Sequence, residues 1–375
     1  MIMNKQKIAF YWNSRSRTGA QQRFLALAKA LNQRGIAAIV LLENRNFQAL
    51  EKINDGPVPH VVGFEWPPMV RLLKKKMCWS SQSLGMRFLK QLHLFLSKQH
   101  VRRLQQEYCV GLWHISMDFR FCRYVSAPAL FEVTSPDWAD RILANPEMVP
   151  ARMPLHAVSD GVYARLVKGL PQRWIIKAPT LFPNIDSRLL CEPDMKIKQK
   201  LIVFAHRFIV RKNGVVFAKA ASRFLDEQPD WRVMIRGEGP DASVMSRIMQ
   251  KHISAGRAEV GFVSDLSADL IASRIFVSII EPDNYPSQSV IEAMAYGNTL
   301  LLSDVGMTKE KFYSHNGMLT EIEENAVYAN LKVLSSDLKK LDTMGINSFC
   351  HFKHSFSQDH YIEHLLGVYH ELGYA

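Results

Sequence analysis

Short runs of β-branched and aromatic residues alternate with amphipathic helical patterns along most of the chain. Such alternation is typical of parallel sheets whose strands are connected by helices, because a parallel strand needs a long crossover and a helix supplies it. The chain opens on this pattern: apolar runs at 7–12 and 36–42 flank a helical segment that ends at Gly35. We therefore predict an α/β protein that begins with a β-α-β unit.

The strand-like runs fall into two sets, separated by the polar, proline-containing stretch 185–200. At about 150 residues per domain, the 375 residues of this chain correspond to two domains. We predict an N-terminal domain over 1–186 and a C-terminal domain over 198–354, with the stretch between them as a linker. A final helix over 355–375 is expected to pack back on the first domain. The expected strands are 7–12, 36–42, 60–64, 110–115, 129–134, 155–159 and 174–178, then 201–205, 232–236, 258–263, 275–280, 299–303 and 317–321.

Composition is that of an ordinary globular protein, with 47% hydrophobic and 22% charged residues. The five cysteines are scattered without C-x-x-C spacing, so neither a disulfide framework nor a zinc site is indicated, and a reducing cytoplasm is expected. The first residues lack the pattern of a secretory leader, and no apolar run reaches the roughly 18 residues that a membrane span needs.

The net charge of +12 is distributed unevenly. The region 67–106 holds nine Lys or Arg and no Asp or Glu, with large apolar residues between them. A basic amphipathic surface of this kind suits an anionic membrane. A solvated helix face that is merely basic is the alternative. Nucleic acid is a third possibility, but no recognisable nucleic-acid-binding module accompanies the region.

Candidate phosphate ligands follow the first strand of the second domain. Arg207 and Lys212 lie in the segment FAHRFIVRKNG, at the carboxyl end of the strand 201–205. A guanidinium and an ammonium at a strand-to-helix junction would suit a diphosphate. Two exposed loop cations are the alternative. After the next strand, Gly237 and Gly239 permit a tight backbone turn, a weak signal by itself.

The stretch EPDNYPSQSVIEAMAYG, 281–297, continues the series. It reads as the exit loop of a buried strand followed by a helix. Ser287 or Ser289 can cap that helix, whose first amides and dipole favour a phosphate. Glu292 lies too far into the helix to be a cap, and its carboxylate could accept hydrogen bonds from a ribose. An ordinary helix glutamate is the alternative.

Together these residues resemble the retaining nucleotide-sugar glycosyltransferases of family 4. The matching features are the Arg207 and Lys212 pair, IRGEGP at 235–240, GFVSD at 261–265 and PSQSVIEAMAYG at 286–297. Weaker matches in the first half extend the resemblance over nearly the whole chain. It implies the GT-B architecture: two Rossmann-like domains that face each other across a cleft, with the last helix crossing back to the first domain.

The resemblance also implies roles for individual residues. Arg207, Lys212 and Glu292 would form the catalytic set, the two cations on the diphosphate leaving group and Glu292 on the ribose. The other donor contacts would come from Gly19, Gly237, the backbone at Phe262, Val263 and Ser264, the side chain of Asn284, and the amides of Ser287, Gln288 and Ser289. Asn284 is a departure, since the family usually carries a glutamate at that place. The lost charge puts the donor contact in doubt.

Acceptor-side residues are expected in the first domain. Arg15 and Arg17 could bind an acidic acceptor or could be exposed loop cations. His114 could hydrogen-bond a sugar, or could be a buried histidine satisfied within its own domain.

The reaction that the resemblance implies is sugar transfer from a nucleotide-diphosphate sugar to a glycan or lipid-linked acceptor, with retention. It would take place at the cytoplasmic membrane face, with the protein bound peripherally through 67–106. The sequence has no D-x-D pair, so we expect no metal and no other cofactor. The alternatives are a degenerate glycan- or partner-binding paralogue and a nucleotide-sugar epimerase. A phosphorylase is disfavoured because no cofactor lysine motif is visible.

Overall fold

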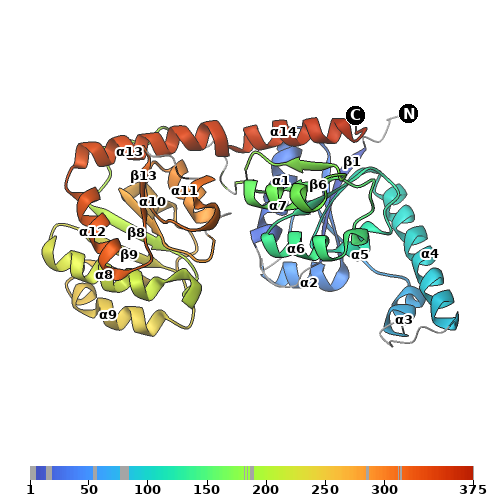
Figure 1. Cartoon of the computed structure of the whole chain (residues 1–375), viewed down its shortest axis with the longest axis horizontal. Helices are drawn as coiled ribbons and strands as arrows, with labels where there is room; N and C mark the ends of the chain where they lie inside the picture. Colours follow the sequence, from blue (N-terminus) through green and yellow to red (C-terminus); the bar gives the residue numbers. More distant parts are fainter. Residues whose placement is uncertain are drawn as a thin grey trace. The chain divides into compact units, whose positions relative to one another are not determined.

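The computed structural model describes residues 6–13, 19–53, 57–76, 84–180, 182–183, 185, 190–283, 287–310, 312 and 315–374. The chain forms two compact units (Figure 1). The first unit consists of Met1–Phe182 and Tyr361–Ala375, and the second unit consists of Pro183–His360.

The first unit contains a seven-stranded sheet in the order β3-β2-β1-β4-β5-β6-β7, and its strand pairs are parallel. The strands are β1 Lys7–Trp12, β2 Ala38–Glu43, β3 Val61–Phe64, β4 Val110–Ser116, β5 Ala129–Val133, β6 Leu155–Ala157 and β7 Ile175–Lys177. The helices are α1 Gly19–Gln33, α2 Asn44–Ile53, α3 Pro68–Lys76, α4 Leu84–Glu107, α5 Phe119–Cys122, α6 Pro136–Ala144 and α7 Asp160–Gly169, with a 3-10 turn η1 at Pro146–Met148.

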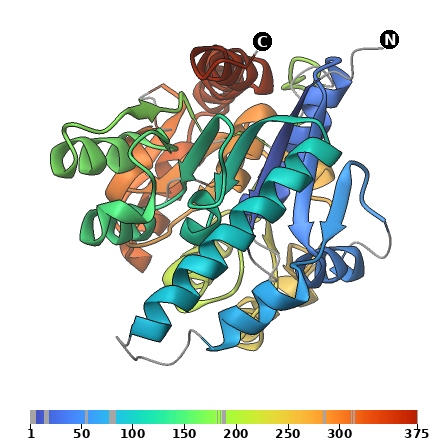
Figure 2. The same cartoon turned by 90° about the vertical axis from the view of Figure 1, so that its right-hand side faces the viewer.

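Both faces of this sheet are covered, as the residues of β1 illustrate. Ala9 and Tyr11 belong to one buried cluster, which includes residues of α4, whereas Ile8 and Phe10 belong to another, which includes residues of α1. Because side chains alternate along a strand, a run buried on both faces reads as continuously apolar. Figure 2 shows α4 crossing one face of the sheet.

The second unit contains a six-stranded parallel sheet in the order β10-β9-β8-β11-β12-β13. The strands are β8 Leu201–Ala205, β9 Arg232–Arg236, β10 Ala258–Gly261, β11 Ile275–Ser278, β12 Thr299–Ser303 and β13 Gly317–Thr320. The helices are η3 Val210–Lys212, α8 Gly214–Glu227, α9 Ala242–Ser254, α10 Ser267–Ala272, α11 Gln288–Ala295, η4 Gly306–Glu310, α12 Glu324–Ser335, α13 Leu338–His351 and a π-helical turn at Phe352–Phe356. Each of the predicted strands is present, with ends shifted by a few residues at most.

The last helix, α14 (Gln358–Glu371), begins at Gln358 rather than at the predicted 355. Its residues from Tyr361 onward belong to the first unit, where Tyr361, Leu365 and Tyr369 are fully buried in the same cluster as Phe10. The face of α14 that carries these three side chains is therefore part of the first unit's core.

The predicted boundaries need correction. The units divide after Phe182 rather than at 186, and the second unit extends to His360. The stretch predicted as a linker packs on the second unit instead. Lys198 is only 5% exposed, and its ammonium donates to the carbonyls of Leu270 and Ser273 at the end of α10. A helix C-terminus favours a cation, which explains why a lysine anchors this stretch.

Candidate functional site

A cavity of about 520 Å³ opens at the carboxyl edge of the second sheet. It is lined by residues at and beyond the ends of β8, β9 and β10, by residues of α10, by Glu292 of α11 and by Tyr296, which caps the end of α11. The strand order reverses between β8 and β11, and this switch point is where open α/β sheets bind ligands. The lining residues are Ile185, Ala205, His206, Arg207, Arg236, Gly237, Glu238, Phe262, Val263, Ser264, Asp265, Leu266, Ser267, Leu270, Glu292 and Tyr296.

Six of the predicted site residues meet in this cavity: Arg207, Gly237, Phe262, Val263, Ser264 and Glu292. They come from four segments that are far apart in the sequence and are brought together by the strand order. The predictions for Lys212, Ser287, Gln288 and Ser289 place them in the same site, but these residues do not line the cavity.

The glycines of the IRGEGP segment are required by close backbone packing. Gly237 and Gly239 have φ angles of 147° and 146°, which side chains disfavour. A Cβ on Gly237 would collide with the carbonyl of His206, and one on Gly239 with the carbonyl of Phe208. Backbone hydrogen bonds join the two loops beyond the strand ends, from the His206 amide to the Arg236 carbonyl (3.0 Å) and from Phe208 to Glu238 (2.8 Å).

Glu292 is the carboxylate of this cavity with an unusual pKa. Burial, followed by the negative charge of Asp265, raises the pKa of Glu292 to about 7. Burial disfavours the negatively charged form of this carboxyl group in the ligand-free protein. Hydrogen bonds from the hydroxyl groups of a ligand would stabilise that form. This arrangement fits the ribose-binding role predicted for Glu292.

The two arginines of the cavity differ in their partners. Arg236 bonds Asp269 (2.6 Å) and Glu259 (2.9 Å), so its charge is neutralised within the protein. Arg207 is exposed and forms no ion pair with a carboxylate in the part of the chain that the structure describes. Arg207 is therefore the guanidinium available to a ligand.

Lys212 ends the short helix η3, next to the exit loop of β11. The Glu281 amide donates to the Arg211 carbonyl (3.1 Å), and the Asn213 side chain donates to the carbonyl of Ile279 (3.0 Å). Burial, followed by the charge of Arg211, lowers the pKa of Lys212 to about 8. The ammonium is thus still charged at neutral pH, and an anion beside it would be stabilised.

Helix α11 starts at the segment that the sequence singled out. Ser287 occupies the N-cap position, as expected, but its hydroxyl makes no capping bond to a helix amide. It lies 3.2 Å from the hydroxyl of Ser289 instead. The predicted cap is therefore only positional. Asn284 lies outside the described residues, so its predicted donor contact stays a prediction.

Among the lining residues to which sequence reasoning assigned no role are three polar ones, His206, Ser267 and Tyr296. Burial and the charge of Lys212 lower the pKa of His206 well below its usual value, so its ring is neutral at neutral pH. The Tyr296 hydroxyl donates to Ser267 (2.9 Å) and joins α11 to α10 across the cavity wall. His206 directly precedes Arg207 at the strand end, which was a usable signal. Nothing in the sequence pairs Ser267 with Tyr296.

The acceptor-side predictions have different outcomes. Arg15 and Arg17 lie outside the described residues. Gly19, which was predicted as a donor contact, is the first residue of α1 in the first unit and does not line the second-unit cavity. His114 is fully buried on β4, and its Nδ1 lies 2.7 Å from the Tyr369 hydroxyl. Of the two alternatives for His114, the histidine satisfied within its own unit is the one that the structure favours, because a buried ring cannot touch an acceptor.

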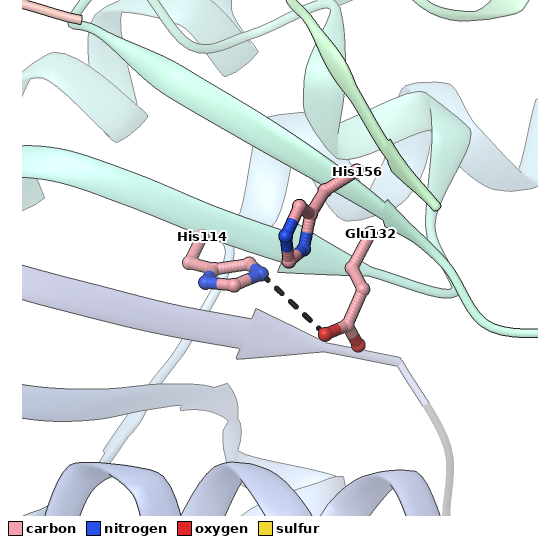
Figure 3. A group of neighbouring side chains, drawn as sticks. All are labelled: His114, Glu132 and His156. Carbon is pink, nitrogen blue, oxygen red and sulfur yellow. Dashed lines mark ion pairs between the residues drawn. The ribbon is translucent and has the colours of Figure 1, made fainter. Parts of the chain in front are cut away.

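The described residues contain one group with the composition of a metal site: His114, Glu132 and His156, on the adjacent strands β4, β5 and β6 (Figure 3). Their ligand atoms all lie within 4.8 Å of one another. Burial, followed by the charges of His156 and Arg23, lowers the pKa of His114 well below its usual value. Its 3.7 Å contact with Glu132 therefore joins a neutral ring to the carboxyl group.

The carboxyl group of Glu132 already has partners in the protein. Arg23 forms a buried ion pair with Oε1, and the Tyr361 hydroxyl donates to Oε2 at 3.4 Å. A guanidinium beside the carboxylate opposes a second cation there. We therefore interpret the group as a buried polar network that joins α1 and α14 to the sheet. The absence of a metal from the reaction stays a prediction.

Comparison with known proteins gives a family for part of the chain. Residues 199–337, within the second unit, match the sequence model of the family described as Glycosyl transferases group 1. A search of curated protein sequences gave no match.

Solved structures share the fold over the whole chain. Sucrose-phosphate synthase from Thermosynechococcus elongatus has a TM-score of 0.71 at 15% identity, covering 98% of this chain and 99% of its own. HepE from Anabaena in complex with UDP has a TM-score of 0.70 at 15% identity, covering 98% and 100%. The pneumococcal O-GlcNAc transferase GtfA in complex with UDP and GlcNAc has 0.71 at 12% identity, covering 99% and 100%. The predicted α/β fold with two Rossmann-like domains is confirmed.

Proposed function

We propose that this protein is a glycosyltransferase that binds a nucleotide-diphosphate sugar in the second-unit cavity and transfers the sugar to a glycan or lipid-linked acceptor. The observation that carries the proposal is the convergence of Arg207, Gly237, Phe262 and Glu292 on one cavity at the sheet's switch point. The cavity falls within the segment that matches the group 1 glycosyltransferase family. Two similar structures were solved with UDP, which makes UDP the first nucleotide to test.

Each part of a nucleoside diphosphate has a candidate partner. Arg207 and Lys212 supply cationic donors for the diphosphate, which becomes the leaving group. Glu292 accepts from the ribose hydroxyls. The ring of Phe262 is 64% exposed on the cavity wall, where a base can stack on it while the backbone nearby supplies hydrogen bonds. No residue in this assignment has to act as a base, since the departing phosphate can take the acceptor's proton.

The direct test is calorimetric titration of the metal-free protein with UDP, and with GDP, ADP, CMP and dTDP for comparison. We expect one nucleotide to bind, and Arg207→Ala and Glu292→Ala each to weaken it at least tenfold, as loss of a charged hydrogen-bonding partner implies. Lys219→Ala is the matched control, because Lys219 is an exposed cation of the same unit outside the cavity. Binding that none of the cavity variants alters would reject this site.

Retention and metal independence belong to the same proposal. Transfer from UDP-sugars to a panel of glycan acceptors is expected to proceed in excess EDTA and to give products with the donor's anomeric configuration, readable by proton NMR. Inverted products would overturn the retaining mechanism, and rescue by Mg²⁺ or Mn²⁺ would overturn metal independence. Tight UDP binding without turnover of any donor would favour a catalytically degenerate binding protein, and turnover of the donor without acceptor would favour an epimerase.

The membrane part of the proposal is supported by exposed apolar side chains within the basic region 67–106. Met69 and Leu72 on α3 and Phe88 and Phe95 on α4 are between 50% and 67% exposed. Phe88 and Phe95 are seven residues apart and so lie on one side of α4, along which basic residues also recur. Apolar insertion combined with basic residues is how amphipathic helices bind anionic membranes. No described helix is both long and apolar enough to span a bilayer.

A further inference from the structure

The first unit has a cavity of its own at the carboxyl edge of its sheet. Residues that follow β1, β3 and β4 line a space of about 370 Å³, together with the last residue of β2 and side chains of α3 and α4. A neighbouring space of about 540 Å³ lies between α3, α4 and the region of α5. The two spaces share five lining residues and form one continuous surface: Lys74, His93, Arg120, Arg123 and Tyr124.

Cations dominate this surface. Lys74, Lys90, Arg120 and Arg123 line it from α3, from α4 and from α5 with the residues after it. Among the described residues, no carboxylate forms an ion pair with Lys90, Arg120 or Arg123, and all three side chains are exposed. Side chains of α3, of α4 and of the region of α5 therefore bring positive charge to one surface.

The carboxylates of the same surface already have hydrogen-bond or ion-pair partners within the protein. Asp118 accepts from the Tyr11 hydroxyl and the Asn13 amide, both at 3.1 Å, and its other oxygen accepts from the amides that begin α5. Glu43 accepts from the Trp66 indole (2.9 Å) and pairs with Arg45 (2.6 Å). The Arg45 pair neutralises Glu43, and the four cations that line the surface outnumber the remaining carboxylate, Asp118, so the surface carries an excess of positive charge.

His93 lines both spaces beside these cations, and its pKa is affected by them. Burial, followed by the charges of Lys74 and Arg120, lowers the pKa of His93. The ring lies 6.0 Å from that of Tyr124, edge to face, and is almost fully buried. A neutral histidine at the floor can donate a hydrogen bond to an anion without adding to the repulsion among the cations.

We propose that this cationic surface binds a phosphate or diphosphate group of the acceptor. Two guanidinium groups and two ammonium groups around one space are better balanced by several phosphate charges than by a single carboxylate, and arginine forks match phosphate oxygens. The assignment to the acceptor rests on the proposed function, because that function places the donor in the second unit. The phosphate site itself depends only on the residues of the first unit.

Calorimetric titration with inorganic pyrophosphate, in the presence of saturating UDP, tests the site. We expect binding to the wild type, a loss of at least tenfold in affinity for Arg120→Ala and for Arg123→Ala, and partial recovery in Arg120→Lys and Arg123→Lys. Lys168→Ala is the matched control, since Lys168 is an exposed cation of the same unit that lies on α7 and outside both spaces. Pyrophosphate that does not bind, or that binds the double Arg120→Ala, Arg123→Ala variant as it binds the wild type, overturns the proposal.

Two further probes distinguish the sources of the phosphate. Farnesyl diphosphate represents a polyprenyl-linked acceptor, and glucose 1-phosphate represents a phosphorylated sugar. Whichever of the two competes with pyrophosphate in an Arg123-dependent way identifies the source, and competition by neither overturns the assignment to an acceptor.

Titration of the same variants with UDP separates the two proposals. UDP binding unchanged by Arg120→Ala and Arg123→Ala, together with lost pyrophosphate binding, supports both the donor site and the phosphate site. UDP binding without any pyrophosphate binding rejects the phosphate site alone. Arg123-dependent pyrophosphate binding without UDP binding rejects the proposed function and retains the phosphate site.

Discussion

Individual side chains of the cavity were assigned from sequence more readily than their electrostatic states. The position of Glu292, in a helix that follows a strand and a Pro-Ser-Gln-Ser turn, was visible in the sequence. Its raised pKa depends on burial and on Asp265, which reaches the same cavity from the segment after β10. Likewise, no local pattern separates the neutralised Arg236 from the available Arg207. These differences in pKa and in ion pairing arise from the neighbours that the tertiary structure places beside each side chain.

Glu292→Gln is expected to stabilise the ligand-free protein in a pH-dependent way. Because the pKa of Glu292 is raised to about 7, the folded state binds its proton more tightly than the unfolded state, and stability falls as pH rises from about 4.5 to 7. Glutamine carries no such penalty. The variant should exceed the wild type by on the order of 3 kcal/mol at pH 8 and match it near pH 4, while UDP affinity falls at least tenfold. Thermal melts at both pH values measure the first effect, and an equal difference at both would contradict it.

The pKa of Lys212 gives a second pH dependence, in the affinity for UDP. The lysine is charged below its pKa of about 8 and loses its charge above it, so UDP affinity should decrease as pH rises past 8. Lys212→Arg keeps its charge in this range and should flatten the decrease. Titrations between pH 7 and pH 9.5 would show this, and a wild-type affinity that is constant over that range would remove Lys212 from the diphosphate site.

Among the elements, the paired loops after β8 and β9 are specified by glycine. Gly237→Ala would place a Cβ against the carbonyl of His206 at a φ of 147°, a conformation that alanine strongly disfavours. We expect a loss of about 2–4 kcal/mol in stability and a loss of UDP binding. Gly256→Ala is the matched control: its φ is also positive, at 68°, but no atom lies near its Cβ position. Equal losses in both variants would show that strain of the backbone, and not the loop contact, determines the effect.

The pair of helices α3 and α4 is expected to bind anionic membranes. Figure 1 shows α3 beside the N-terminal part of α4 at the margin of the first unit. Phe88→Ser with Phe95→Ser should reduce sedimentation with vesicles of phosphatidylglycerol and phosphatidylcholine, and Lys98→Ala with Arg102→Ala should do the same. Val167→Ser with Lys168→Ala changes an exposed apolar residue and an exposed cation on α7 and serves as the control. Sedimentation equal to that of the control would remove the membrane from the proposed function.

For the molecule as a whole, α14 makes the first unit discontinuous in sequence. Leu365 is fully buried in a cluster with residues of α1 and β1, and Tyr369 joins His114 by a hydrogen bond. Leu365→Ala should lower the stability of the first unit by about 2–5 kcal/mol, whereas Glu363→Ala on the exposed side of the same helix should change it by less than about 0.5 kcal/mol. A two-step thermal melt monitored with and without UDP would assign the change, because UDP is expected to stabilise the second unit only. A shift of the UDP-sensitive step would contradict this assignment.

The alternation of strands and helices and the two-domain plan could be predicted from sequence, because periodicity and turn residues are local properties. The donor contacts, which come from the family resemblance, stay a prediction. Three features could not be predicted. Lys198 belongs to a polar stretch that reads as a linker in the sequence, and nothing there indicates that its ammonium bonds to distant carbonyls. Nor does the sequence around His114 indicate that Glu132 and His156, on neighbouring strands, lie beside it. The cationic surface brings together Lys74 and Arg123, which are separated in the sequence by α4, β4 and α5. Contacts of this kind depend on strand order and helix packing. A local sequence pattern does not show which residues from distant segments will be buried next to one another.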